Sequence, residues 1–221
     1  MKSKSSSEIR EIFLKFFEKN DHLIHPPSSL IPANDPTLLL TNSGMAQFKN
    51  YFSGEAEPPK KRITSSQKCF RSTDIDEVGD STHLTLFEML GNFSFGDYFK
   101  EEACQMALNL MVNELDFDLE KIFITVHNDD LETKKIWLKL GIPDEKIFFF
   151  GDSDNWWGPA GDEGPSGPCS ELHYYIGKEN INKKIKDNDN KWGPNIHEDF
   201  VELYNLVFTQ FYHHLDGKRT E

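Results

Sequence analysis

The sequence predicts an α+β fold with a mostly antiparallel sheet of about six strands flanked by helices. Helical and extended segments follow one another without the regular alternation of a doubly wound fold, and two of the extended segments are spaced as a hairpin. The chain has 221 residues, of which 37% are hydrophobic and 13% aromatic. A chain this rich in aromatic residues can bury a core, which excludes a largely disordered protein.

The first predicted element is an amphipathic helix over residues 5–19. Its apolar residues recur every three or four positions, which is the spacing of one helix face, and a serine precedes it as an N-cap. Pro26 and Pro27 then break the chain. Residues 38–41 are a candidate buried strand, and residues 44–52 are predicted to form a short helix.

Two extended segments, residues 65–71 and 84–90, are predicted to pair as a hairpin. The linker between them, residues 72–83, is polar and long. Long loops in compact domains tend to carry function, so this hairpin is a first candidate for a site.

The remaining elements continue the mixture of helices and strands. Residues 151–168 are predicted to form a loop, because eight of these 18 residues are Gly or Pro. Residues 178–191 are polar and are predicted to form a surface excursion. The other predicted elements are, in order, a helix over 99–115, a strand over 122–127, a helix over 131–140, and strands over 147–150, 169–176 and 202–211.

Charge and composition exclude several classes of protein. The chain has 24 Lys and Arg against 37 Asp and Glu, a net charge of −13, so it should not coat nucleic acid on its own. No apolar stretch approaches the roughly 20 residues needed to cross a bilayer, and no apolar segment follows the N-terminus as in a secretory signal. Cys69, Cys104 and Cys169 lie far apart and form no disulfide framework. A cytoplasmic protein without membrane contact is the simplest interpretation.

The segment 60–71 is basic within an otherwise acidic chain. It holds five Lys or Arg residues and no acidic residue. It is either a solvated strand end or a polyphosphate site, in which the planar guanidinium of Arg71 would bind phosphate oxygens with two hydrogen bonds. The glycine motifs of P-loop and Rossmann nucleotide sites are absent from the sequence.

Three further segments carry candidate site residues. On the strand that follows the linker, Phe87 is either a core residue or a platform on which an adenine stacks. The loop 154–171 contains two adjacent tryptophans that either enclose a small pocket or have a purely structural role. Glu202 and Asn205 lie three residues apart on a predicted strand and should face opposite sides, so both reach one ligand only with a β-bulge or a ligand lying along the strand.

Together these segments closely resemble the catalytic domain of the alanyl-tRNA synthetase family, which belongs to the class II aminoacyl-tRNA synthetases. The resemblance runs from about Ser7 to Gly217. Its most specific part is the string Phe-Glu-Met-Leu-Gly-Asn-Phe-Ser-Phe-Gly-Asp-Tyr-Phe at residues 87–99. The other segments that carry it are residues 34–45, the strand that ends in Arg71, and residues 164–171.

The resemblance implies a class II synthetase fold and an enzyme, an alanine–tRNA ligase. This enzyme would convert L-alanine and ATP to alanyl-adenylate and pass the alanine to tRNA(Ala). The ATP site would consist of Arg71 at the α-phosphate, His83 near the β- and γ-phosphates, Phe87 stacked on adenine, the backbone of Met89 on the base, and Glu88 beside them.

The resemblance also implies a site for alanine and for the metal ion carried by ATP. Met45, Trp157 and Asn205 would line the alanine pocket, and Glu202 would help to hold Mg²⁺. Two departures from the family pattern are visible. Many members carry a Gly-Gly-Lys-His-Asn stretch after the arginine that corresponds to Arg71, and this stretch is absent here.

The second departure lies at Glu221, where the sequence ends before the place of the third motif of the class. Residues 1–221 are therefore expected to be a catalytic domain without its last part. On this expectation the segment alone is a weak enzyme, and tRNA(Ala) binds mainly through regions outside it.

Two functions of other classes compete with this one. The first is a module that binds ATP or a partner without catalysis. The second is a zinc hydrolase, but its potential ligands have no standard zinc spacing, so zinc is not expected in this segment. Those potential ligands are Cys169, His173, His197, His213 and His214.

Overall fold

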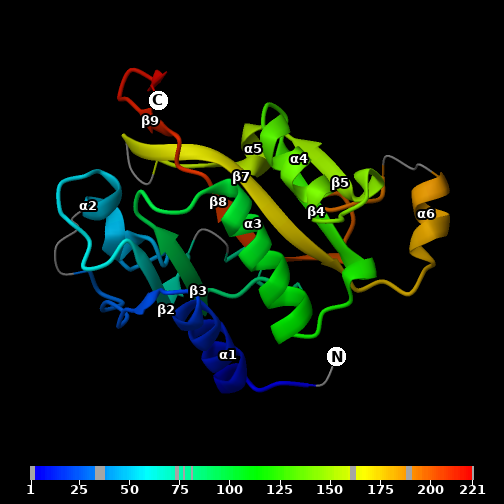
Figure 1. Ribbon diagram of the computed structural model, residues 1–221, viewed down its shortest axis with the longest axis horizontal. Helices are drawn as coiled ribbons and strands as arrows, with labels where there is room; N and C mark the ends of the chain where they lie inside the picture. The colour runs from blue at the N-terminus through cyan, green and yellow to red at the C-terminus, as the bar shows by residue number, and fades with distance from the viewer. Residues whose placement is uncertain are drawn as a thin grey trace. The chain divides into compact units, whose positions relative to one another are not determined.

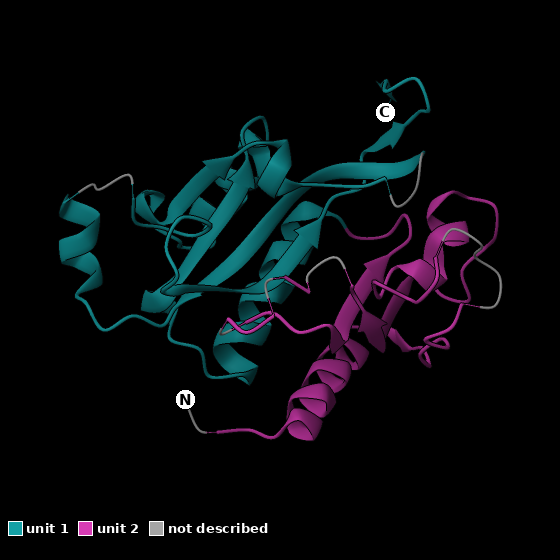
Figure 2. Ribbon diagram, turned by 180° about the vertical axis from the view of Figure 1, so that it is seen from behind, with its two compact units in different colours: residues 1, 99–221 teal, residues 2–98 magenta. Residues whose placement is uncertain are grey.

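The computed structural model describes residues 3–32, 38–72, 75–76, 78–80, 82–159, 163–187 and 191–220 (Figure 1). Residues 34–37, which carry part of the family resemblance, lie outside the described residues, as do parts of the linker 72–83. The chain divides into two compact units (Figure 2). Unit 2 comprises residues 2–98, and unit 1 comprises residue 1 and residues 99–221.

Unit 2 begins with the predicted amphipathic helix, α1 (Ser6–Lys19). Ser5 caps it, because its hydroxyl accepts a hydrogen bond from the Glu8 N–H while the Glu8 carboxylate accepts one from the Ser5 N–H. Phe13, Phe16 and Phe17 lie on its buried face. The prediction of this helix and of its serine cap is confirmed.

The sheet of unit 2 has the strand order β1-β2-β3. The strands are β1 (Leu23–Ile24), β2 (Arg62–Phe70) and β3 (Leu86–Ser94). β1 runs parallel to β2, and β2 pairs antiparallel with β3 in a register that places Cys69 opposite Phe87. The predicted hairpin is therefore confirmed.

The segment before β2 corrects one prediction. Residues 38–41 do not form a strand, and the Leu39 side chain is 91% exposed. Thr41 donates its N–H to the Leu30 carbonyl, and its own carbonyl accepts from the Phe70 N–H, both at 2.8 Å. It therefore makes one hydrogen bond to each of two segments instead of the repeated hydrogen bonds of a strand pair. The predicted short helix is present as a 3₁₀ turn (Ala46–Phe48) followed by α2 (Lys49–Phe52).

Unit 1 is built on a seven-stranded sheet in which β7 is central. The main order is β10-β9-β7-β4-β5, and β6 and β8 also pair with β7. Figure 1 shows β7 as the long strand that crosses this sheet. The strands are β4 (Ile122–His127), β5 (Ile147–Phe150), β6 (Trp156–Trp157), β7 (Gly164–Tyr175), β8 (Phe200–Val207), β9 (Phe211–His213) and β10 (Arg219–Thr220).

Two helices of unit 1 lie close to the predicted positions, α3 (Lys100–Asn109) and α4 (Leu131–Lys139), whereas α6 (Ile181–Asp187) forms within residues 178–191, for which a surface excursion is predicted. Trp137 of α4 is fully buried and donates its indole N–H to the Ser170 hydroxyl of β7 at 2.8 Å, which fixes α4 on the sheet. None of the helices among the described residues is long and apolar enough to cross a bilayer. The helices are α3 (Lys100–Asn109), which continues as a π-helical turn (Leu110–Glu114), α4 (Leu131–Lys139), α5 (Asp152–Asn155), α6 (Ile181–Asp187), and 3₁₀ turns at Leu119–Lys121 and Asp144–Lys146.

The α+β class and the mostly antiparallel pairing are confirmed, with three differences. The described strands form two sheets instead of one. β4, α4 and β5 form a parallel β-α-β unit. Because this pattern occurs once, it does not produce the regular alternation by which such units are recognised in a sequence. The predicted loop 151–168 contains α5, β6 and the beginning of β7, where Gly164 and Pro165 pair with β9 and Gly167 and Pro168 pair with β6.

Candidate functional site

The hairpin of unit 2 brings Arg71 and Phe87 together. Arg71 follows β2 directly and is held in place by two hydrogen bonds. Its backbone N–H donates to the Thr85 carbonyl at 2.9 Å, and its Nε–H donates to the Asn42 carbonyl at 3.0 Å. The guanidinium carbon lies 5.4 Å from the centroid of the Phe87 ring. The two residues predicted for the α-phosphate and for adenine are therefore neighbours.

The methionines predicted for the site belong to two segments of unit 2 that touch. Met89 lies opposite Gln67 in the hairpin, and its sulfur is 3.1 Å from the backbone N of Gly44. Met45 follows Gly44 directly and precedes the 3₁₀ turn. The contact between Met89 and Gly44 thus places the segment of Met45 beside β3, the strand that carries Phe87 and Met89.

Two other predicted ATP ligands have protein partners. The Glu88 carboxylate accepts hydrogen bonds from Arg10 of α1, at 2.6 Å from Nη2 and 3.0 Å from Nε. His83 bonds to Asp80 through its backbone N–H at 2.7 Å and through its ring. The hydrogen bonds from the backbone and the ring of His83 lower the pKa of the Asp80 carboxyl well below its usual range. The structure therefore directs Glu88 toward α1 and His83 toward its own loop.

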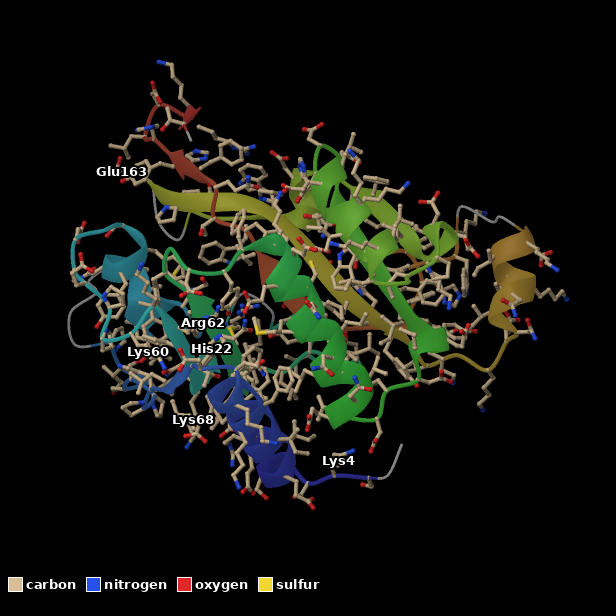
Figure 3. All side chains as sticks on the ribbon, in the orientation of Figure 1. Lys4, His22, Lys60, Arg62, Lys68 and Glu163 are labelled. Atoms are coloured by element: carbon tan, nitrogen blue, oxygen red, sulfur yellow. The ribbon has the colours of Figure 1, made fainter. Side chains whose placement is uncertain are left out.

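The basic segment 60–71 is partly neutralised within unit 2. Lys60 pairs with Asp21, and Arg62 pairs with Asp97 at 2.6 Å. Lys60, Arg62 and Lys68 are labelled in Figure 3. Arg62 and Arg71 each lie beside an aromatic ring: Arg62 is 5.0 Å from the centroid of Tyr98 and also binds the Asp97 carboxylate, whereas Arg71 lies beside Phe87.

Trp157 belongs to unit 1, where a tight loop positions it. β6 pairs with β7 in a register that sets Trp157 opposite Gly167. Gly158 follows with a φ of +85°, and a Cβ there would lie 2.5 Å from the Pro165 carbonyl oxygen. Only glycine fits this position, so the chain after Trp157 is held against β7.

A β-bulge brings Glu202 and Asn205 onto the same face of the sheet of unit 1. Asn205 lies opposite Glu171, and Glu202 lies opposite His173, with a shift of register between Leu172 and His173. The extra residue on β8 reverses the alternation of side chains. Of the two conditions under which both side chains could reach one ligand, a bulge or a ligand lying along the strand, the structure shows the bulge.

Beneath Asn205 lies a buried carboxylate that the sequence analysis did not single out. Glu171 is 5% exposed, and its oxygens accept hydrogen bonds from Asn205 Nδ2 at 3.1 Å and Thr125 Oγ1 at 2.9 Å. His173 Nε2 lies 3.1 Å away from the same carboxylate. One signal in the sequence could have pointed to Glu171: it lies within a predicted strand, and a glutamate that is buried in a strand nearly always has hydrogen-bond or ionic partners.

The chemistry around Glu171 argues against a nucleophilic thiol. Burial, and then the negative charges of Glu171 and Glu202, raise the pKa of the Cys169 thiol far above its usual range. Cys169 is 1% exposed. A protonated, enclosed thiol is not a nucleophile, so no covalent intermediate is indicated at this residue.

Glu202 is the residue of unit 1 that the resemblance implies for the magnesium ion carried by ATP. Glu202 has an exposed carboxylate, and Mg²⁺ is commonly held by one or two carboxylates together with phosphate oxygens and water. In the part of the chain that the structure describes, no three His, Cys, Asp or Glu side chains are grouped so that they could hold a metal. The zinc alternative therefore has no assembled ligand set there.

Unit 1 also contains a pocket of about 510 Å³ that none of the predicted site residues lines. Two ion pairs form in its lining, Lys100 with Asp130 and Arg219 with Asp152, each at 2.8 Å. The Arg219 guanidinium stacks on Trp156 at 3.9 Å. Asp129 and Glu132 also line the pocket, so its acidic residues outnumber its lysine and arginine and its net charge is negative.

Comparison with known proteins gives consistent matches. The family model of class II tRNA synthetases (A) matches residues 8–221. A curated alanine–tRNA ligase of Dehalococcoides mccartyi is 52% identical over 216 residues, which are 97% of this chain and 24% of that protein. Those of Rubrobacter xylanophilus and Leptospira interrogans are 48% and 51% identical, over 98% of this chain and 26% and 22% of theirs. The chain thus spans about a quarter of the length of these relatives.

Proposed function

The chain belongs to the class II tRNA synthetases, and on this basis we propose that it activates L-alanine with ATP to form alanyl-adenylate, from which alanine is transferred to tRNA(Ala). The observation that carries the proposal is the pairing of Arg71 with Phe87, at 5.4 Å, on the hairpin of unit 2. The names of the relatives support alanine as the amino acid. On this proposal, residues 1–221 form the adenylate-forming catalytic domain.

The proposed reaction needs positioning and charge neutralisation. A carboxylate oxygen of alanine attacks the α-phosphorus of ATP in line, and the bond to the pyrophosphate oxygen breaks. The attacking carboxylate is already ionised, so no general base is required. Arg71 would stabilise the negative charge that develops on the α-phosphate, and Phe87 would hold the adenine. Mg²⁺, which Glu202 would help to hold, would neutralise further phosphate charge.

Trp157 and Asn205 of unit 1 stay proposed as alanine-binding residues, and so does Met45 of unit 2. An indole wall held by the close contact at Gly158 excludes large side chains by steric hindrance. The remaining ligands, His83, Glu88 and Met89, stay proposed for ATP. A reducing, cytoplasmic site of action is supported by the three cysteines, which are all free and buried.

The proposal is tested by amino-acid-dependent exchange of pyrophosphate into ATP, measured on the complete gene product. Alanine is expected to give the highest kcat/KM, with serine and glycine measurable. A hydrophobic wall discriminates one methylene by only about 1–3 kcal/mol and rejects an added hydroxyl poorly. Valine should be inactive. Equal rates with valine would refute the assignment of Trp157, and no exchange with any amino acid would favour a non-catalytic ATP-binding module.

Phe87→Ala is expected to weaken ATP binding about 5- to 150-fold, because base–aromatic stacking contributes roughly 1–3 kcal/mol. Titration calorimetry with ATP measures the effect. Phe149→Ala is the matched control, since Phe149 also lies beside a cation, with Lys134 Nζ at 5.3 Å from its ring. An unchanged dissociation constant in Phe87→Ala would exclude stacking on this ring.

A further inference from the structure

Glu171 is a buried carboxylate that is surrounded by hydrogen-bond donors. It is 5% exposed, and it lies on the centre strand of unit 1. A buried carboxylate is costly unless its oxygens are hydrogen-bonded, and a well-packed apolar residue often gives equal or greater stability at such a position. A charge that is buried at such a cost points to a role beyond packing.

The donors are divided unequally between the two oxygens. Oε2 accepts from Thr125 Oγ1 at 2.9 Å and from Asn195 Nδ2 at 3.4 Å, and His173 Nε2 lies at 3.1 Å from it. Oε1 accepts from Asn205 Nδ2 at 3.1 Å. An ionised carboxylate can only accept hydrogen bonds, so each neighbouring amide must turn its amino group toward it, and the imidazole must turn an N–H toward it.

This orientation decides what Asn205 presents to a ligand. Its amino group is turned toward Glu171, so its carbonyl oxygen Oδ1 points the other way. The bulge in β8 places Asn205 on the face that also carries Glu202. An amide oxygen on this face is an acceptor, and the α-ammonium group of an amino acid offers only donors.

We propose that Glu171 is a positioning residue for alanine binding: it holds the Asn205 amide with its carbonyl oxygen toward the substrate, where that oxygen accepts a hydrogen bond from the alanine ammonium group. The negative charge of Glu171 behind the amide also attracts the ammonium group. This inference rests on the proposed function, in which Asn205 lines the alanine pocket.

Glu171→Gln tests the inference because it inverts the amide. The glutamine oxygen is expected to occupy the Oε2 position, where three donors converge, so its amino group takes the Oε1 position and faces Asn205. Asn205 must then turn its carbonyl inward and present its amino group to the ammonium, donor against donor. The KM for alanine in pyrophosphate exchange, measured on the complete gene product, should rise about tenfold, while the KM for ATP stays unchanged.

A second substitution should restore binding. In Glu171→Gln/Asn205→Asp, one oxygen of the new carboxylate accepts from the glutamine amino group and the other faces the ammonium. The KM for alanine should then return to within about threefold of the wild-type value. Asn205→Asp alone sets two carboxylates against each other and should impair alanine binding. Restoration by the pair of changes cannot be explained by a role of Glu171 in stability alone.

Ser170→Ala is the matched control. Ser170 is the neighbour of Glu171 on the same strand, points to the opposite face and makes two buried hydrogen bonds, from Trp137 and to the Thr125 carbonyl, both at 2.8 Å. It should lower the melting temperature without changing the KM for alanine. A wild-type KM in Glu171→Gln, or no restoration in the double variant, would overturn the inference. Absence of alanine-dependent exchange in the wild type would instead overturn the proposed function.

Discussion

Arg71→Ala is expected to reduce kcat/KM for alanine-dependent pyrophosphate exchange by roughly 10²- to 10³-fold. A charged donor aimed at the position where negative charge develops typically contributes this much, because it is already oriented when the reaction begins. The hydrogen bond from Nε to the Asn42 carbonyl provides that orientation, and it leaves the terminal amino groups of the guanidinium to bind phosphate oxygens.

Two further variants test whether the effect depends on the position and shape of the charged group at Arg71 or only on the positive charge. Arg71→Lys retains a positive charge but loses the planar pair of donors, so it should recover only part of the rate. Lys68→Ala removes the same charge from an exposed position on β2, the strand that precedes Arg71, and should leave the rate within about twofold of wild type. If Lys68→Ala and Arg71→Ala reduced the rate equally, general electrostatic attraction of ATP would explain the effect, and the role proposed for Arg71 would be wrong.

The hairpin that holds Arg71 could be predicted from the sequence because its signals are local. Two β-forming segments flank a polar linker, and their pairing follows from adjacency in the chain. The helix at Ser6–Lys19 is similarly encoded by its own apolar spacing and by a capping serine. The segment 38–41 looked like a strand on its own, but its backbone bonds to two different segments, which a local pattern does not reveal.

The site residues of unit 1 were harder to predict because they depend on contacts between distant strands. The bulge that aligns Glu202 with Asn205 is a property of the pairing of β8 with β7 and has no local signal at Leu203. In the sequence, Glu171 is only the last residue of the segment 164–171, whereas in the fold its donors come from three other segments of unit 1. Its role depends on partners that are brought together only by the fold.

Gly167→Ala is expected to destabilise unit 1 by about 3 kcal/mol, the upper part of the usual range for overpacking. A Cβ at this position would lie 1.8 Å from the Phe208 carbonyl oxygen and 2.7 Å from the Phe208 carbonyl carbon. Both atoms belong to the backbone, so no rotation of a side chain relieves the contact. β7 must then move away from the chain that follows β8, and Trp157, which pairs with Gly167, must move with it.

Differential scanning calorimetry should show a decrease of roughly 6–12 °C in melting temperature for Gly167→Ala, given about 2–4 °C per kcal/mol for a chain of this size. Gly151→Ala is the control in the same unit: its φ is −90°, and the nearest atom to its new Cβ is Asn128 Nδ2 at 3.6 Å. It should leave the melting temperature unchanged or raise it slightly, because alanine restricts the unfolded chain. Equal melting temperatures for the two variants would mean that β7 does not approach Phe208 as closely as described.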